Sequence, residues 1–199
     1  MRPRIDAYFG LLGRLGPASQ VTDETGRPLA IEAAFDLFIR QTRAAHDAGG
    51  KMMFVGNGGS AAIASHMAVD YSKNGGLRSL AFNDGAMLTC LGNDLGYENV
   101  FAKPVELFGR ADDVLIAISS SGRSPNILNA VAAARRVGCW VVTLSGFGAD
   151  NPLRQAGDVN LYVANDRYGF VEITHLSLLH AMLDLAMGWR AGVAADATA

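Results

Sequence analysis

The sequence contains few cysteines, few charged residues and no long uncharged apolar run. Its 199 residues include two cysteines, Cys90 and Cys139, whose separation fits neither a metal site nor a disulfide framework. We interpret both as small buried residues of a protein in the reducing cytoplasm. No apolar run approaches the roughly 20 residues of a membrane span, and Arg4, Asp6 and Arg14 interrupt any signal-peptide core. We therefore expect a cytoplasmic protein that does not engage a membrane.

The charge balance excludes a further class of partner. The chain has 17 Lys and Arg residues against 19 Asp and Glu residues, and its formal net charge is −2. The basic residues are scattered, so there is no electrostatic footprint for nucleic acid. Half of the residues are hydrophobic and 18% are charged, as in a globular protein of ordinary composition. We expect one domain over residues 1–199, without nucleic acid as a direct ligand.

One stretch, residues 114–138, combines the features around which the chain is organised. Residues 114–118 are apolar and uncharged, which favours a strand buried on both faces, and apolar residues then recur at helical spacing. Pro125 suits the first helical position, after an N-cap at Ser124. Backbone N–H groups, hydroxyls and the helix dipole suit a phosphate monoester. A turn that only caps its helix is the alternative, but it would need fewer hydroxyls. The predicted phosphate ligands are Ser119, Ser120, Ser121 and Ser124.

A second loop of the same kind lies earlier in the chain. Residues 51–55 read as a strand, and the glycine-rich segment 56–60 follows it, where glycines permit close backbone approach. Ser60 suits the N-cap of a helix that runs to about residue 71. On that helix His66 and Asp70 are four apart and share one face. A tight turn is the simplest interpretation of segment 56–60, but its position between strand and helix favours a ligand.

The remaining pattern alternates strands with helices. We predict strands at 77–82, 139–144 and 160–163, and helices at 3–15, 30–48, 98–109 and 170–190, with a loop at 16–29 and a frayed tail at 191–199. Asp94 lies between glycines, where it either contacts a sugar hydroxyl or closes an Asx-turn. We therefore predict an α/β fold: a three-layer, doubly wound parallel sheet of about five strands with extra N-terminal helices. Ligands should bind at the carboxyl ends of the strands.

Four segments together resemble the SIS (sugar isomerase) domain family. They are GNGGSAAIASH at 56–66, GND at 92–94, SSSGRSPNILNAV at 119–131 and EITHLSLLH at 172–180. The resemblance covers roughly residues 30–190 and extends to the phosphoheptose isomerase branch, which converts sedoheptulose 7-phosphate to D-glycero-D-manno-heptose 7-phosphate. It implies a flavodoxin-like fold and a homotetramer with active sites at subunit interfaces. The N-terminal helices at 3–48 are the expected contributors to oligomerisation.

The resemblance also implies roles for individual residues. In this branch the serine loop holds phosphate, and Asn57 and Asp94 match residues that contact the sugar. We add Gly58, Ser60 and Glu172 to the expected substrate site. Some members bind zinc through the positions that match His66, Asp70, Glu172 and His180, and no organic cofactor is implied. The branch usually has Glu at position 70 and Gln at 172. It also has a longer connection after Asp70, so another C5 to C8 sugar phosphate is the alternative substrate.

Aldose–ketose isomerisation needs groups that move a proton between C1 and C2 through an enediol. Asp70 and His180 are the candidates, and a bound zinc ion that polarises the carbonyl is the alternative use of the same side chains. Glu172 and His180 are eight residues apart, about 12 Å along a helix axis. Either Glu172 precedes the regular helix, or the two residues serve sites in different subunits.

Two further expectations concern a residue and a function class. His175 matches no ligand position and is expected to be a satisfied core histidine or a surface one. SIS domains also act as noncatalytic sensors or scaffolds, and one related branch binds the bacterial replication initiator as a tetramer. Retention of an acid at position 70 together with His180 favours an enzyme over such a role.

Overall fold

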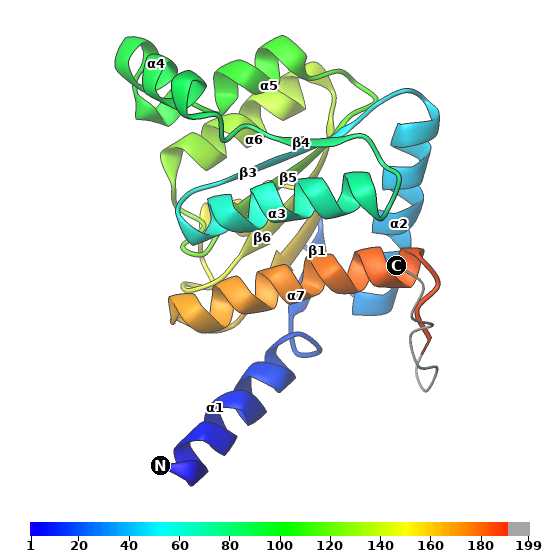
Figure 1. The fold of residues 1–199 in the computed structure, drawn as a ribbon, viewed down its shortest axis with the longest axis vertical. Helices are drawn as coiled ribbons and strands as arrows, with labels where there is room; N and C mark the ends of the chain where they lie inside the picture. The colour runs from blue at the N-terminus through cyan, green and yellow to red at the C-terminus, as the bar shows by residue number, and fades with distance from the viewer. Residues whose placement is uncertain (191–199) are drawn as a thin grey trace.

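The chain folds around a single mixed sheet, which Figure 1 shows crossed by long helices. The computed structural model describes residues 1–190, and the tail expected to fray, 191–199, lies outside them. In the described part the sheet has seven strands in the order β2-β1-β7-β6-β5-β3-β4. The strands are β1 (Gln20–Asp23), β2 (Pro28–Leu29), β3 (Met52–Gly56), β4 (Ser79–Ala81), β5 (Val114–Ser119), β6 (Trp140–Ser145) and β7 (Val159–Tyr162).

Strands β3 to β7 form the predicted parallel sheet. Each pairs in parallel with its neighbours in the order β4-β3-β5-β6-β7, the flavodoxin-like order with a switch point between β3 and β5. Alternate residues of β5 belong to two separate apolar cores, with Ile116 and Ile118 in one and Leu115 and Ala117 in the other. The uncharged run at 114–118 is therefore explained by burial on both faces, and the predicted fold class is confirmed.

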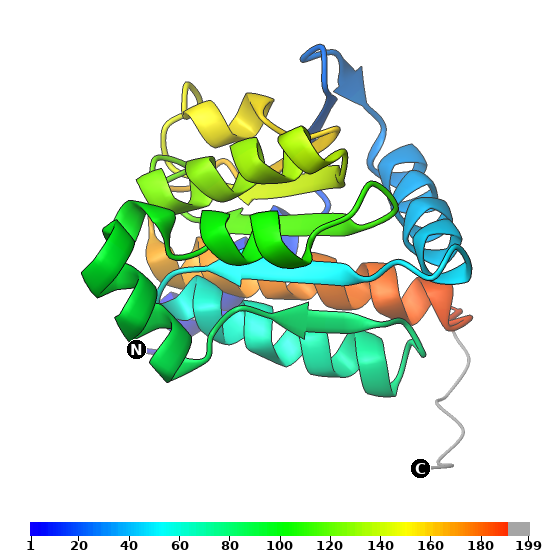
Figure 2. The same ribbon diagram turned by 90° about the horizontal axis from the view of Figure 1, so that it is seen from above.

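Helices cover both faces of this sheet. The first core includes side chains from α2 (Ile31–Asp47), α3 (Gly59–Lys73) and α7 (Tyr168–Ala186), and the second includes side chains from α5 (Ala102–Phe108) and α6 (Pro125–Val137). Partly buried residues of α4 (Gly85–Leu95) pack against the second core. Helices α3 and α7 lie side by side over one face, as Figures 1 and 2 show. This pairing brings the two helices that carry the predicted histidines into contact.

The prediction of a loop at 16–29 is wrong. Strands β1 and β2 form an antiparallel hairpin, and β1 pairs antiparallel with β7 at the edge of the sheet. The hairpin turn is stabilised by Asp23, whose carboxylate accepts hydrogen bonds from the Thr25 hydroxyl (2.7 Å) and from the backbone of Thr25 and Arg27. The bond from the Thr25 hydroxyl is the largest reason why the pKa of Asp23 falls to about 2.

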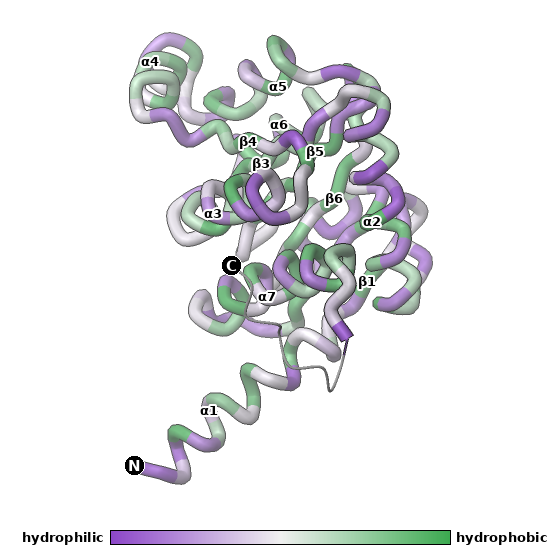
Figure 3. The backbone as a smooth tube through the Cα atoms, turned by 45° about the vertical axis from the view of Figure 1, so that its right-hand side comes forward, coloured by the Kyte–Doolittle hydropathy of each residue, from purple (hydrophilic) through white to green (hydrophobic). Residues whose placement is uncertain are grey.

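Helix α1 (Arg2–Leu15) projects from the body of the domain, and the tube in Figure 3 shows it extending away from the sheet with both hydrophobic and hydrophilic residues along it. Leu15 is its only buried residue in the described chain, while Ile5, Tyr8 and Phe9 are exposed. Tyr8 reaches Phe170 of α7, with ring centroids 4.5 Å apart. In residues 1–190 no helix combines the length and apolar character that crossing a membrane would require.

Candidate functional site

Two strand-to-helix loops meet at the carboxyl ends of β3 and β5. Because Gly56 of β3 pairs with Ile118 of β5, the glycine-rich loop and the serine loop (residues 119–124) begin side by side. They enclose a cavity of about 320 Å³, open to solvent. Its lining comprises Asn57, Gly58, Gly59, Ser60, Ile118, Ser119, Ser120, Ser121, Ser124, Tyr168 and Glu172. The cavity therefore lies at the predicted carboxyl ends of the strands, next to the switch point between β3 and β5.

The serine loop gathers hydroxyls at the N-terminus of α6. Ser124 occupies the N-cap position and Pro125 the first turn, as predicted, but the Ser124 side chain makes no capping bond. The Ser119 hydroxyl instead donates to the Ser124 hydroxyl (3.3 Å) and accepts from the Gly122 N–H (3.2 Å). The buried Ser120 hydroxyl has no hydrogen-bond partner among the described residues. A buried hydroxyl without a partner is costly, so this arrangement favours an anionic ligand that would accept a hydrogen bond from it.

The segment that follows β6 packs against the serine loop. Gly122 has a left-handed φ of 62° and lies directly against the buried side chain of Asn151. The Gly122 carbonyl accepts a hydrogen bond from the Leu153 N–H (3.2 Å). Arg123 forms an ion pair with Asp150 (2.8 Å), and the hydrogen bond from Arg123 lowers the pKa of Asp150. These three contacts fix the backbone that presents the serines.

Asn57, the predicted sugar contact, is held by two other side chains. Its amide exchanges two hydrogen bonds with the amide of Asn126, both 2.8 Å long. The Tyr97 hydroxyl also donates to its oxygen (3.0 Å). Asn126 is buried at the start of α6, so this pair ties the glycine-rich loop to the helix that follows the serine loop. Neither Asn126 nor Tyr97 was predicted from the sequence as a site residue.

Ser60 lines the cavity but does not cap α3, in contrast to the prediction. The helix begins at Gly59, and its N-cap is Gly58, whose φ of 53° suits a glycine. Ser60 lies in the first turn and is buried. Position 59 requires glycine, because a Cβ there would overlap the carboxylate of Glu172. Glu172 thus lies against the N-terminal turn of α3, where the helix dipole favours a carboxylate.

His66, Asp70 and His180 form a second cluster, between α3 and α7. The two histidine Nε2 atoms are 3.2 Å apart, which requires one ring to donate a hydrogen bond to the other. One carboxylate oxygen of Asp70 lies 3.4 Å from His66 Nε2 and 3.7 Å from His180 Nδ1. A ligand atom from each of the three lies within 4.8 Å of the others. Two imidazoles and one carboxylate are the donor set of a zinc site with an open position, so these residues fit the metal.

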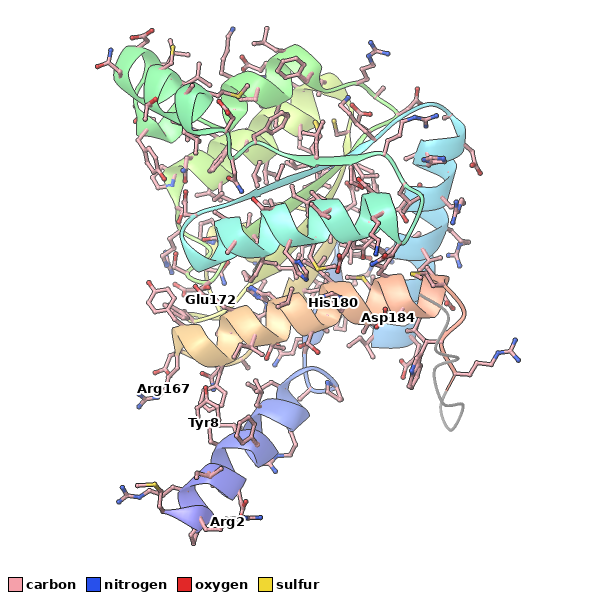
Figure 4. The ribbon with its side chains drawn as sticks, in the orientation of Figure 1. Arg2, Tyr8, Arg167, Glu172, His180 and Asp184 are labelled. Atoms are coloured by element: carbon pink, nitrogen blue, oxygen red, sulfur yellow. The ribbon has the colours of Figure 1, made fainter. Side chains whose placement is uncertain are left out.

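The predicted set of four zinc ligands does not assemble in one chain. Glu172 lies inside α7, so the possibility that it precedes the regular helix is wrong. It lines the cavity, whereas His180, two turns further along, joins the cluster with His66. Figure 4 shows Glu172 and His180 at separate points along α7, both below α3. The cavity carries Glu172 and the cluster carries the other three side chains.

Asp94 lies in neither place. It is an exposed residue in the last turn of α4, rather than in a glycine-bracketed turn, and it accepts hydrogen bonds from its neighbours Cys90 (3.6 Å) and Asn93 (2.8 Å). Asp84 caps the N-terminus of α4 by accepting a hydrogen bond from the Met87 N–H (2.9 Å), and the helix continues through Gly92 to Leu95. Asp94 therefore does not share the cavity of its own chain in the described residues.

The two cysteines differ in burial. Cys139 is buried as predicted, and burial raises the pKa of its thiol to about 11. Cys90 is exposed, so the prediction of a buried residue is wrong for it. Position 90 falls on the outer face of α4, a helix without fully buried residues.

His175 is a buried histidine, one of the two outcomes expected from the sequence. Its Nε2–H donates to the Ser145 carbonyl (3.1 Å), and its Nδ1 has no partner among the described residues. Burial lowers the pKa of this imidazole to about 4. The ring is therefore neutral at physiological pH, and it packs between α7 and the end of β6.

Comparisons with known proteins identify the family of the chain and similar folds. Residues 19–146 match the family model described as "SIS domain". The chain is 42% identical over 144 residues to a phosphoheptose isomerase of Solidesulfovibrio magneticus, covering 69% of both chains. It is 36% identical over 146 residues to one of Escherichia coli, covering 69% of this chain and 74% of that protein. The structure of phosphoheptose isomerase GmhA from Neisseria gonorrhoeae superposes with a TM-score of 0.77 at 32% identity, over 93% of this chain and 98% of that one.

Proposed function

We propose a substrate and a mechanism for this chain, which belongs to the phosphoheptose isomerase branch of the SIS domain family and is a sugar-phosphate isomerase. The proposed reaction converts sedoheptulose 7-phosphate to D-glycero-D-manno-heptose 7-phosphate through an enediol. The relatives named phosphoheptose isomerase support this substrate. The reaction is proposed to occur in the cytoplasm, and residues 1–199 are proposed to form one SIS domain.

The cavity at the serine loop carries this proposal. It combines the four predicted phosphate ligands with Asn57, Gly58 and Glu172 around one space. The Ser120 hydroxyl, which has no partner within residues 1–190, and the N-terminus of α6 both favour an anion there. In this proposal the phosphate lies at the serine loop, and the sugar extends toward the glycine-rich loop.

The separation of the two clusters supports an active site shared between subunits. Glu172 and His180 are both inside α7, at a spacing of about 12 Å along the axis. The exposed apolar residues of α1 offer a surface that a second copy could cover. We therefore propose that the chain forms a homotetramer, with the N-terminal helices at 3–48 contributing to the contacts between subunits. The serine loop and the His66–Asp70–His180 cluster that act on one sugar would come from different subunits.

Asp70 and His180 are the proposed proton-moving groups. Asp70 is largely buried at its carboxylate, with 18% of the side chain exposed, and it lies beside both rings. A carboxylate there can take the proton from one carbon of the substrate, and the imidazole of His180 can exchange the proton between the two oxygens. Zinc bound by His66, Asp70 and His180 would supply a Lewis acid for the carbonyl oxygen. In that alternative the three side chains hold the ion in place.

A direct test is the conversion of sedoheptulose 7-phosphate by the purified protein, followed by NMR of the C1 proton. The wild type should interconvert ketose and aldose, and Asp70→Asn and His180→Ala should each lower kcat at least about 100-fold. Asp184→Asn is the matched control, because Asp184 is exposed on α7 one turn beyond His180. It should retain wild-type activity.

The metal is tested separately by its binding. Dialysed protein should take up one zinc ion per chain, and His66→Ala should lose this uptake while its thermal unfolding midpoint stays close to that of the wild type. Absence of zinc uptake, together with full activity in a chelator, would remove the metal from the mechanism. Binding of sugar phosphates without any turnover, with or without zinc, would instead contradict the isomerase function.

A further inference from the structure

Among residues 1–190, Tyr168 is the one aromatic side chain that lines the cavity at the serine loop. It is the first residue of α7, four residues before Glu172, so both side chains leave the same face of the helix. Tyr168 is 61% exposed, and its hydroxyl makes no hydrogen bond to any of residues 1–190. We propose that Tyr168 contacts the carbon chain of the bound sugar phosphate and sets the enzyme's affinity for it.

The ring of Tyr168 is held in place rather than free at the surface. Phe147 meets it edge-on, with ring centroids 4.8 Å apart and an angle of 70° between the planes. Edge-to-face contact is one of the two preferred arrangements of aromatic rings, and it leaves a face of the tyrosine free for another contact. Phe147 therefore acts as a positioning residue for Tyr168.

The backbone of Phe147 provides an independent observation. Its φ is 57°, which makes it the one non-glycine residue with positive φ in the described part of the chain. Two hydrogen bonds maintain this conformation: the Phe147 N–H donates to the Asn165 carbonyl (2.9 Å), and the Tyr162 hydroxyl donates to the Phe147 carbonyl (2.7 Å). A bulky residue persists in a strained conformation only where its surroundings impose it, and such strain clusters at ligand sites.

The chemistry of a sugar phosphate matches the two sides of the cavity. The serine loop offers hydroxyls and a helix N-terminus to the phosphate, whereas the tyrosine ring offers an apolar face to the C–H groups of the sugar. Inorganic phosphate, which has no carbon chain, should occupy the serine loop alone. The contribution of Tyr168 should therefore appear with the sugar and be absent with phosphate.

This inference rests on the proposed function, and its test uses the full-length protein. Calorimetric titrations of sedoheptulose 7-phosphate and of inorganic phosphate would be compared for wild type, Tyr168→Ala and Tyr168→Phe. Tyr168→Ala should weaken sugar-phosphate binding about tenfold and raise KM equally, with kcat preserved, because the lost contact is present before the reaction begins. Tyr168→Phe keeps the ring and should stay within about twofold of the wild type.

Two further variants separate the ring from the fold. Phe147→Gly relieves the backbone strain but removes the supporting ring, so it should raise KM with kcat preserved. Ile173→Ala is the matched control, since Ile173 is an exposed residue of α7 outside the cavity, and it should change neither constant. Inorganic phosphate should bind all four variants as it binds the wild type.

The two dissociation constants decide the matter. An unchanged affinity of Tyr168→Ala for the sugar phosphate overturns the inference, as does an equal loss for inorganic phosphate, which would mean that the substitution distorts the serine loop. A wild type that binds the sugar phosphate without isomerising it overturns the proposed function, but the same two constants still test Tyr168. A wild type that binds neither ligand overturns both proposals.

Discussion

Replacement of His175 by Gln should remove a defined part of the protein's sensitivity to acid. The imidazole is fully buried, and this burial lowers its pKa to about 4, against an ordinary value of 6.5. Between these two values the unfolded chain binds a proton at this residue and the folded chain does not. The free energy of unfolding therefore rises with pH across this window, and it falls as the pH drops from 6.5 toward 4.

The size of the effect follows from the pKa difference. One proton changes the free energy of unfolding by about 1.4 kcal/mol per pH unit, so the whole window is equivalent to about 3 kcal/mol. Between about pH 7.5 and about pH 5, where most carboxylates stay ionised, the expected share is about 2 kcal/mol. His175→Gln keeps a side-chain N–H for the Ser145 carbonyl and has no proton to gain.

Urea unfolding followed by circular dichroism, at one protein concentration, measures this difference. The wild type should lose about 2 kcal/mol more than His175→Gln when the pH is lowered over that range. Thr174→Ser is the control, since Thr174 is the buried neighbour on α7 and does not titrate. It should shift the unfolding free energy equally at both pH values.

Identical pH dependence in wild type and His175→Gln would refute the reasoning. It would mean that His175 is protonated in the folded protein or that its surroundings open readily to water. A wild type that becomes more stable as the pH falls from 6.5 would contradict the sign as well as the magnitude.

Two further predictions concern backbone positions fixed by side chains. Gly122→Ala should weaken inorganic phosphate binding and destabilise the protein by at least about 1 kcal/mol, because φ is 62° there and a methyl group would overlap Asn151. Phosphate titration measures the affinity, and thermal unfolding measures the stability. An unchanged phosphate affinity would contradict the role of the contact between Gly122 and Asn151. Asp23→Asn should lower the thermal unfolding midpoint at neutral pH, and the difference from the wild type should vanish toward pH 2. The pKa of Asp23 is lowered from 3.8 to about 2 in the folded chain, so its carboxylate stabilises the fold above about pH 3.8, and this stabilisation is lost as the pH falls through about 2. A difference that persists at that pH would argue against the carboxylate as its source.

The parallel sheet could be predicted because each central strand carries its own local signal. The run at 114–118 is apolar on both faces, and the glycine-rich and serine loops interrupt the pattern where strands end. The β1–β2 hairpin has no comparable signal, since β1 is four residues long and its partner β7 lies far along the chain. Its pairing is decided by tertiary contact rather than by local propensity.

Part of the candidate site could also be predicted from the sequence. Residues that sit on loops between strand and helix, such as Asn57 and Ser120, could be placed together because parallel strands end at one edge of the sheet. The helical separation of Glu172 from His180 could also be calculated from the sequence. Tyr168 could not be found this way, because a tyrosine at a helix start carries no distinctive pattern. Its position depends on a strained residue in another loop.

The two outermost strands of the sheet have a consequence for solubility at high concentration. Strand β2 has two residues and β4 has three, and each lies at one edge of the sheet. A long, flat edge offers a row of unpaired N–H and C=O groups on which other chains can polymerise. Here each edge offers only a few such groups, so a strand of another molecule can form few hydrogen bonds to it. The short edge strands therefore give the folded domain a low tendency to form fibrils.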